Sequence, residues 1–155
     1  MRRRFLPFAI AFLLLAACAV VPSSQNKQEF LLYFVSTQEH GPSIIGQPYE
    51  TDGSPTPKEL IQALLAGPTQ EELHSPFPAG LTLRSCTLEG THLTVDFSEQ
   101  YGGLTDISLT LADYCVVRTV CQLEEIDTVE ITVSGNPLPY RSHQVLTQQE
   151  ALPAP

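Results

Sequence analysis

The sequence predicts a single small α+β domain over residues 29–137, a β-α-β-β-α-β sandwich in which two helices cover one face of a roughly four-stranded sheet. The length of 155 residues corresponds to one domain. Two segments, beginning near residues 93 and 129, alternate apolar and polar side chains, which is typical of strands that bury only one face. Two amphipathic segments between the strands carry the apolar stripes of helices that would cover this face.

The chain is expected to enter the domain through a central strand. Residues 29–36, with the sequence EFLLYFVS, are aromatic and aliphatic enough for a strand that is buried on both faces. Glycine and proline are frequent in residues 37–56. We expect this segment to be a long loop that contains at most a short extended piece at Ile44 and Ile45.

The clearest helix signal is the sequence TPKELIQALLAGP at residues 56–68. Thr56 is a suitable N-cap, Pro57 takes the first helical position, and Glu59 stands where a capping box needs an acidic residue. Apolar residues three and four positions apart form one stripe, and Gly67 followed by proline ends the helix.

The second half of the domain is predicted to contain a hairpin, a helix and a last strand. Residues 81–98 form the hairpin, which turns at Glu89 and Gly90, and residues 128–135 form the last strand. Everything after Pro137, residues 138–155, is rich in proline and glutamine and is expected to be a flexible tail. The helix between hairpin and strand has a stripe of residues three or four apart: Leu109, Ala112, Val116, Val120 and Leu123.

The N-terminal segment, residues 1–17, has the pattern of a secretion signal. Three arginines precede thirteen mostly apolar residues, a run shorter than the about 20 residues that cross a bilayer. The run ends in Leu15, Ala16, Ala17 and Cys18, which resembles the lipobox of bacterial lipoproteins.

This pattern predicts cleavage before Cys18 and attachment of lipid to that cysteine. Residues 18–28 would then form a lipidated N-terminus and a short tether, and the domain would lie at the extracytoplasmic face of the bacterial cell membrane. The alternative is ordinary signal-peptidase cleavage near Ala17 or Cys18, with the cysteine present by chance and no lipid attached to it.

The charge of the processed chain limits its partners. Without residues 1–17 the chain keeps five basic and all seventeen acidic residues, a net charge of −12 with histidine counted as neutral. Such a chain repels polyphosphates and anionic lipid headgroups, so the sequence argues against nucleic-acid binding. The membrane contact is therefore expected to be the lipid on Cys18 rather than a basic surface.

Three cysteines remain besides Cys18, namely Cys86, Cys115 and Cys121. Because three is an odd number, at most one pair can form. A disulfide between Cys86 and Cys115 is open if strand and helix pack together, and plain buried thiols are the other outcome.

No motif in the sequence announces a reaction. The four histidines lie in no motif with serine or cysteine, and the chain has no metal-ligand spacing and no phosphate-binding glycine loop, so we expect neither a metal nor a cofactor. Paired carboxylates could hydrolyse glycosidic bonds, which leaves a cell-wall hydrolase as the alternative function, against solvated surface carboxylates on an acidic protein. The carboxylates in question are Asp96, Glu99, Asp106, Asp113, Glu124, Glu125 and Asp127.

Five pieces of sequence, in their order along the chain, resemble the GerMN domain, a family named for a lipoprotein of sporulation and spore germination. They are LLYFVS, LIQALLAGP, FPAGLTL, LEGTHLTVDFS and VVRTVCQLEEIDTVEITVSG, which together cover about residues 30–137. The resemblance implies a module without enzymatic activity. It also implies a likeness to the ring-building domains of envelope assemblies, whose sheet edges and helices pack against other copies or partners.

The resemblance further implies what the domain would bind. A half-covered sheet has an open face and unpaired edges, and we expect an envelope protein, a second copy of the chain or peptidoglycan to bind there during sporulation, spore germination or envelope assembly. The polar residues predicted on the open face are Thr94, Asp96, Ser98, Thr128, Glu130 and Thr132.

Overall fold

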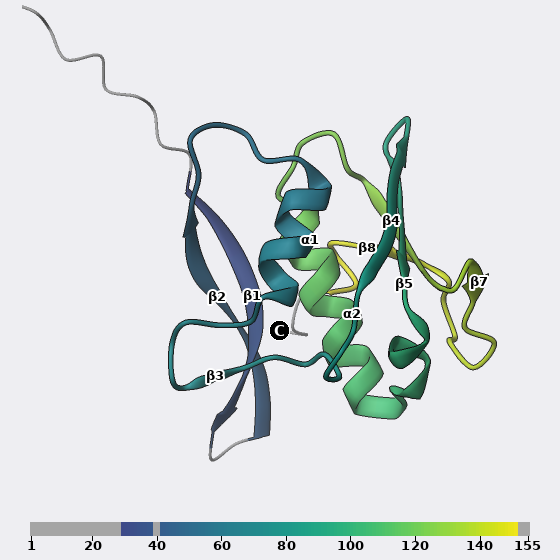
Figure 1. Ribbon diagram of the computed structural model, residues 1–155, viewed down its shortest axis with the longest axis horizontal. Helices are drawn as coiled ribbons and strands as arrows, with labels where there is room; N and C mark the ends of the chain where they lie inside the picture. Colours follow the sequence, from purple (N-terminus) through teal and green to yellow (C-terminus); the bar gives the residue numbers. More distant parts are fainter. Residues whose placement is uncertain (1–28, 39–40, 152–155) are drawn as a thin grey trace, which may run out of the picture.

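The computed structural model describes residues 29–38 and 41–151, which have the α+β architecture expected from the sequence. Helices α1 (Pro57–Leu65) and α2 (Asp106–Val120) lie between two sheets (Figure 1). The arrangement differs from the expected single sheet because the first strand belongs to a sheet of its own. The predicted signal peptide, Cys18 and the tether lie outside the described residues.

The two sheets differ in size and in strand direction. The three-stranded sheet has the order β2-β1-β3, with β1 at Glu29–Gln38, β2 at Gly41–Glu50 and β3 at Leu73–His74. The five-stranded sheet has the order β4-β5-β6-β7, and β8 also pairs with β6. Only β5 and β6 are parallel, because α2 crosses between them. The strands of this sheet are β4 (Leu83–Glu89), β5 (His92–Phe97), β6 (Thr128–Val133), β7 (Asn136–Pro137) and β8 (Val145–Thr147).

Side chains at the C-terminal end of α2 complete the hydrogen bonding of β1 on the edge that faces away from β2. The side-chain amide of Gln122 accepts a hydrogen bond from the Leu31 N–H at 2.9 Å and donates one to the Leu31 carbonyl at 2.7 Å. The Thr119 hydroxyl accepts a hydrogen bond from the Tyr33 N–H at 3.1 Å. These two side chains take the place of a neighbouring strand, which explains why β1 does not join the five-stranded sheet.

The prediction of a long loop over residues 37–56 is wrong, because half of this segment forms β2 and its first two residues belong to β1. β2 is an edge strand that pairs only with β1, and Pro48 stands opposite Leu31. The Leu31 N–H points away from β2 and donates to Gln122, so at this position the two strands exchange no hydrogen bonds. The N–H that Pro48 lacks would therefore point to the edge of β2 that faces away from β1, where proline is tolerated. Gly46 faces Tyr33, whose Cε1 would lie 3.2 Å from a Cβ at that position, so the glycine permits close packing rather than a turn.

Helix α1 begins as the sequence predicts, with a complete capping box. The Glu59 carboxylate accepts a hydrogen bond from the Thr56 N–H at 2.7 Å, and the Thr56 hydroxyl accepts one from the Glu59 N–H at 3.3 Å. The predicted stripe is buried at Leu60, Ile61 and Leu64. The helix is therefore defined by local sequence at its start and by core packing along its length.

The predicted hairpin is formed by β4 and β5, and the apolar faces of β5 and β6 point toward the helices. The segment after β5 forms a 3-10 helix, η1 (Glu99–Gly103), before α2 begins. In the part of the chain that the structure describes, no helix is both long and apolar enough to cross a bilayer. The fully buried residues of β5, β6 and α2 that share one core are Leu93, Val95, Phe97, Val129, Ile131, Ala112, Val116, Val117 and Val120.

The prediction of a flexible tail after residue 137 is wrong for residues 138–151, which pack against the domain. Leu138, Leu146 and Ala151 belong to the common core. β8 pairs with the first half of β6, and β7 pairs with its last two residues. The proline- and glutamine-rich composition did not reveal that a few apolar residues in this segment are enough to hold it.

Candidate functional site

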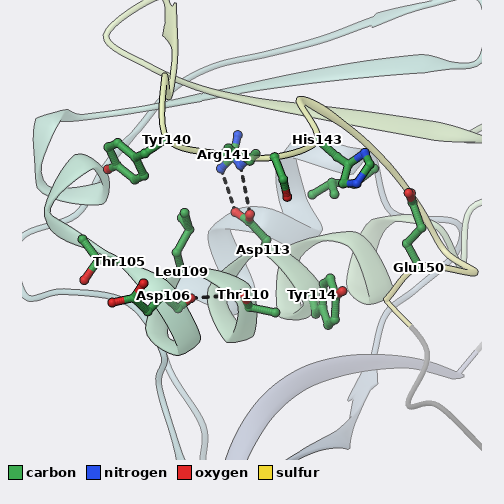
Figure 2. A pocket seen from close by; sticks show the side chains of 12 residues that line it. Thr105, Asp106, Leu109, Thr110, Asp113, Tyr114, Tyr140, Arg141, His143 and Glu150 are labelled. Carbon is green, nitrogen blue, oxygen red and sulfur yellow. Dashed lines mark hydrogen bonds and ion pairs between the residues drawn. The ribbon is translucent and has the colours of Figure 1, made fainter.

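A pocket of about 640 Å³ lies between α2 and the segment formed by residues 140–150 (Figure 2). From the loop before α2 and from the helix, the pocket is lined by Thr105, Asp106, Leu109, Thr110, Asp113 and Tyr114. From the C-terminal segment, it is lined by Tyr140, Arg141, Ser142, His143, Leu146 and Glu150. The pocket therefore depends on the packed segment that the sequence led us to expect as a flexible tail.

The pocket wall contains a buried ion pair between Asp113 and Arg141. The guanidinium donates to both carboxylate oxygens, from Nε at 3.0 Å and from Nη2 at 2.8 Å. The Tyr101 hydroxyl donates a third hydrogen bond to Asp113 at 2.7 Å. The remaining guanidinium nitrogen, Nη1, donates to the Ile131 carbonyl at 2.6 Å, so Arg141 ties the C-terminal segment to both α2 and β6.

Arg141 supplies a hydrogen-bond partner to β6 at the point between the residues that pair with β8 and those that pair with β7. β8 pairs with β6 as far as Glu130, and β7 begins to pair at Thr132, which leaves Ile131 between them. The Arg141 guanidinium satisfies the Ile131 carbonyl at this position. Buried backbone carbonyls require such partners.

Both oxygens of the Asp113 carboxylate accept hydrogen bonds from neighbouring side chains. Burial raises the pKa of Asp113, and the neighbouring Arg141 charge opposes the increase. The three donated hydrogen bonds favour the ionised form, and they occupy both carboxylate oxygens. The geometry thus indicates a structural ion pair that shapes the pocket.

The rim of the pocket carries an exposed aromatic ring and a free carboxylate. Tyr140 is 51% exposed, yet its hydroxyl donates a hydrogen bond to the Gly102 carbonyl at 2.6 Å, which fixes the position of the ring. Asp106 opens α2 with a φ of 50°, and its side chain makes no hydrogen bond or ion pair with the described residues. Figure 2 shows Tyr140 on the C-terminal segment and Asp106 at the start of α2, on opposite sides of the pocket.

The six polar residues predicted on an open sheet face are brought close together by β5 and β6. We call the face of these two strands that points away from the helices the outer face. Thr94 lies opposite Glu130, and Asp96 lies opposite Thr132, in the parallel register. The Thr128 hydroxyl lies 2.8 Å from Nδ1 of His92.

Asp96 and Thr132, two of these six residues, are buried and hydrogen-bonded within the outer face. The Asp96 carboxylate accepts hydrogen bonds from the Thr132 hydroxyl at 2.8 Å, the Gly135 N–H at 2.7 Å and Arg84 Nε at 3.0 Å. Burial alone would raise the pKa of Asp96, but these three donors together lower it below the ordinary value. Ser98 accepts a hydrogen bond from the Thr82 N–H and extends the hairpin. Thr94, Thr128 and Glu130 remain half-exposed on this face.

The disulfide between Cys86 and Cys115, which the sequence left open, does not form, and both thiols are free. Burial raises the pKa of Cys115 to about 12 and that of Cys121 to about 11. Thiols of this kind are protonated at neutral pH and are poor nucleophiles. Among residues 29–38 and 41–151, no three His, Cys, Asp or Glu side chains are placed to hold a metal ion.

The carboxylates considered for glycoside hydrolysis differ in their surroundings. Asp96 and Asp113 are both buried, and each is bonded to an arginine of its own. Glu99, Asp106, Glu124, Glu125 and Asp127 are exposed. Sequence reasoning missed Arg141, although a signal was present: it is one of only eight basic residues, and it directly follows Leu138, Pro139 and Tyr140 in the segment that was expected to be flexible.

Comparison with known proteins identifies relatives of this domain. The sequence model of the Germane family, described as sporulation and spore germination, matches residues 31–139. The tandem GerMN domains of the sporulation protein GerM from Bacillus subtilis align with a TM-score of 0.62 and 16% identity, over 84% of this chain and 48% of theirs. The chain therefore spans about half the length of that tandem structure.

Two further structures align over most of their own length. The first GerMN domain of Bacillus subtilis GerM has a TM-score of 0.63 and 18% identity, covering 79% of this chain and 98% of that domain. A candidate lipoprotein from Clostridium perfringens has a TM-score of 0.55 and 22% identity, covering 80% of this chain and 89% of its own. No curated protein sequence shows significant similarity to the chain.

Proposed function

Since the chain belongs to the Germane family of sporulation and spore germination, we propose that it is a lipid-anchored extracytoplasmic protein whose single domain is a binding or assembly module without catalytic activity. The anchor is the lipid on Cys18, and the tether over residues 18–28 holds the domain close to the membrane. The partner is an envelope protein or a second copy of the chain. The candidate lipoprotein from Clostridium perfringens, which shares the fold, supports the anchor.

The observation that carries this proposal is the outer face of the five-stranded sheet. Neither helix covers it, since both lie on the other side of the sheet (Figure 1). Its half-exposed residues Thr94, Thr128 and Glu130 form a polar surface. β4, at the edge of the same sheet, pairs only with β5 within the described residues and leaves its other edge open. An open sheet edge beside a polar face is suited to pairing with another protein.

The binding role is tested by crosslinking and affinity capture of the full chain from membranes. Thr94→Arg places a long charged side chain at the centre of the outer face, and Ser43→Arg makes the same change on the exposed surface of β2 in the other sheet. We expect Thr94→Arg to lose the captured partner and Ser43→Arg to keep it. Capture that survives Thr94→Arg would show that the outer face is not the binding surface.

The anchor is tested separately by metabolic labelling with a fatty acid. Cys18→Ser should abolish labelling of the chain and release it from the membrane fraction, because no other part of the proposed mature chain binds lipid. Circular dichroism should remain unchanged, since the domain core lies entirely beyond residue 29. Labelling that persists in Cys18→Ser would overturn the lipid attachment.

A further inference from the structure

We propose that the pocket between α2 and residues 140–150 binds a short carbohydrate that carries amino groups. This goes beyond the function proposed above, which depends on the outer face of the five-stranded sheet and makes no use of the pocket. The proposal is based on the polar character of the pocket wall, the fixed ring of Tyr140 and the free charge of Asp106.

The wall of the pocket suits a ligand with many hydroxyl groups. Its volume of about 640 Å³ lies within the usual range of small-molecule sites. Leu109 and Leu146 are the only aliphatic side chains in its lining, and the other side chains are hydroxyl, carboxylate, aromatic or basic. The hydroxyls of Tyr114 and Ser142 make no hydrogen bond within the described part of the chain, so they are available to a ligand.

Tyr140 provides a flat apolar surface at the rim. Its hydroxyl is held by the Gly102 carbonyl at 2.6 Å and lies 3.3 Å from the Leu104 carbonyl, while half of the side chain remains exposed. An aromatic ring that is exposed but immobilised loses little entropy when a ligand stacks on it. One face of a sugar ring consists largely of C–H groups, which pack well on such a ring.

The charges around the pocket favour amino groups over acidic groups on the ligand. Arg141 and Asp113 neutralise each other within the wall. Among the described residues, the carboxylates of Asp106 and Glu150 are not paired with an arginine or lysine, so these two side chains leave negative charge in the lining. A carboxylate accepts charge-assisted hydrogen bonds from an ammonium group and from sugar hydroxyls, whereas it repels phosphates and uronic acids.

The proposal is tested by calorimetric titration of the full chain in detergent micelles. The probes are a glucosamine tetramer, its N-acetylated form, a galacturonic acid tetramer and tetralysine. We expect the glucosamine tetramer to bind most tightly, the N-acetylated form about tenfold more weakly because it lacks the ammonium groups, and the acidic tetramer not at all. Tetralysine should bind more weakly than the glucosamine tetramer because it has no ring to stack on Tyr140.

Two variants separate the two parts of the site. Asp106→Asn removes the charge and suits the positive φ at this position, because asparagine tolerates that conformation. It should weaken glucosamine binding about tenfold and weaken binding of the N-acetylated tetramer much less, because the asparagine amide oxygen still accepts hydrogen bonds from sugar hydroxyls. Tyr140→Leu should weaken both tetramers about fivefold, while Glu125→Gln, an exposed carboxylate outside the pocket, should change neither.

Two results would overturn the proposal. The first is that none of the saccharides binds to the full chain. The second is that tetralysine binds as tightly as the glucosamine tetramer and that Tyr140→Leu leaves both unchanged, which would mean that the site recognises cationic peptides through charge alone. Neither result would affect the binding role of the outer face, which Thr94→Arg tests independently.

Discussion

Replacing Arg141 by methionine removes the guanidinium that neutralises Asp113 and satisfies the Ile131 carbonyl. Both side chains of the ion pair are almost completely buried, with 4% and 6% of their surface exposed. Removing one partner of such a pair typically costs about 3–5 kcal/mol, because the other charge remains buried without compensation. The free energy of unfolding of an ordinary domain is only about 5–15 kcal/mol. We therefore expect Arg141→Met to lose about a fifth or more of the stability of the domain.

The measurement is urea unfolding at pH 7, followed by circular dichroism, on a chain that begins at residue 29. Tyr101→Phe and Asp113→Leu are added to Arg141→Met so that no buried polar side chain of the cluster is left without a partner. This triple variant should be clearly more stable than Arg141→Met alone, since apolar groups can replace a buried ion pair at little cost. The Ile131 carbonyl remains unsatisfied in both variants and does not affect the comparison.

The cost of Arg141→Met should also depend on pH. Burial raises the pKa of Asp113 in the folded chain, and this increase becomes larger when Arg141 is absent. Below the ordinary value of 3.8, Asp113 is protonated in both the folded and unfolded states, so the variant loses least there. As the pH rises toward the folded pKa, the unfolded state ionises first and the deficit grows. A loss below about 1 kcal/mol at pH 7, or a triple variant no more stable than the single one, would refute the reasoning.

Three further predictions concern other parts of the fold. Because the pKa of Asp96 is lowered, its contribution to stability is present above the ordinary value of 3.8 and is lost as the pH falls through the folded pKa. In urea titrations, the stability difference between the unchanged chain and Asp96→Asn should therefore shrink between pH 5 and pH 2. Gln122→Ala should destabilise the domain by about 1–3 kcal/mol, since it leaves the backbone of Leu31 without partners, and a melting temperature equal to that of the unchanged chain would contradict the role of Gln122. Cys115 should react with iodoacetamide at pH 8 far more slowly in the folded chain than in urea, since burial raises its pKa to about 12. The two rates are measured by mass spectrometry, and equal rates would show that this thiol is accessible.

The sequence predicted best those elements whose signals are local. Thr56 and Glu59 lie three residues apart, so the capping box that starts α1 could be recognised without knowing the fold. The alternation in β5 and β6 likewise predicted which side chains face the helices, and the order of motifs indicated the family that the sequence comparison confirms. Periodicity and capping are properties of one segment, which is why they can be seen in the sequence.

The edge strand β2 could not be predicted because its signals have two meanings. Pro48 and Gly46 indicate a turn when the segment is considered alone. Once β1 lies beside it, the register places the missing N–H of Pro48 on the solvent edge and leaves Gly46 under the Tyr33 ring. Only the pairing of two strands determines whether proline interrupts a strand or is accommodated in it.

By itself, the sequence determined the α+β class, the start of α1, the buried faces of β5 and β6, and the family of the domain. The tertiary structure alone decided that the first strand forms a separate sheet, that residues 138–151 pack against the core, and that Arg141 reaches Asp113 to shape a pocket. These features arise from contacts between residues far apart in the chain. A buried arginine or a strand edge is stable only when a distant segment supplies its partner, and the spacing of residues along the sequence does not contain that information.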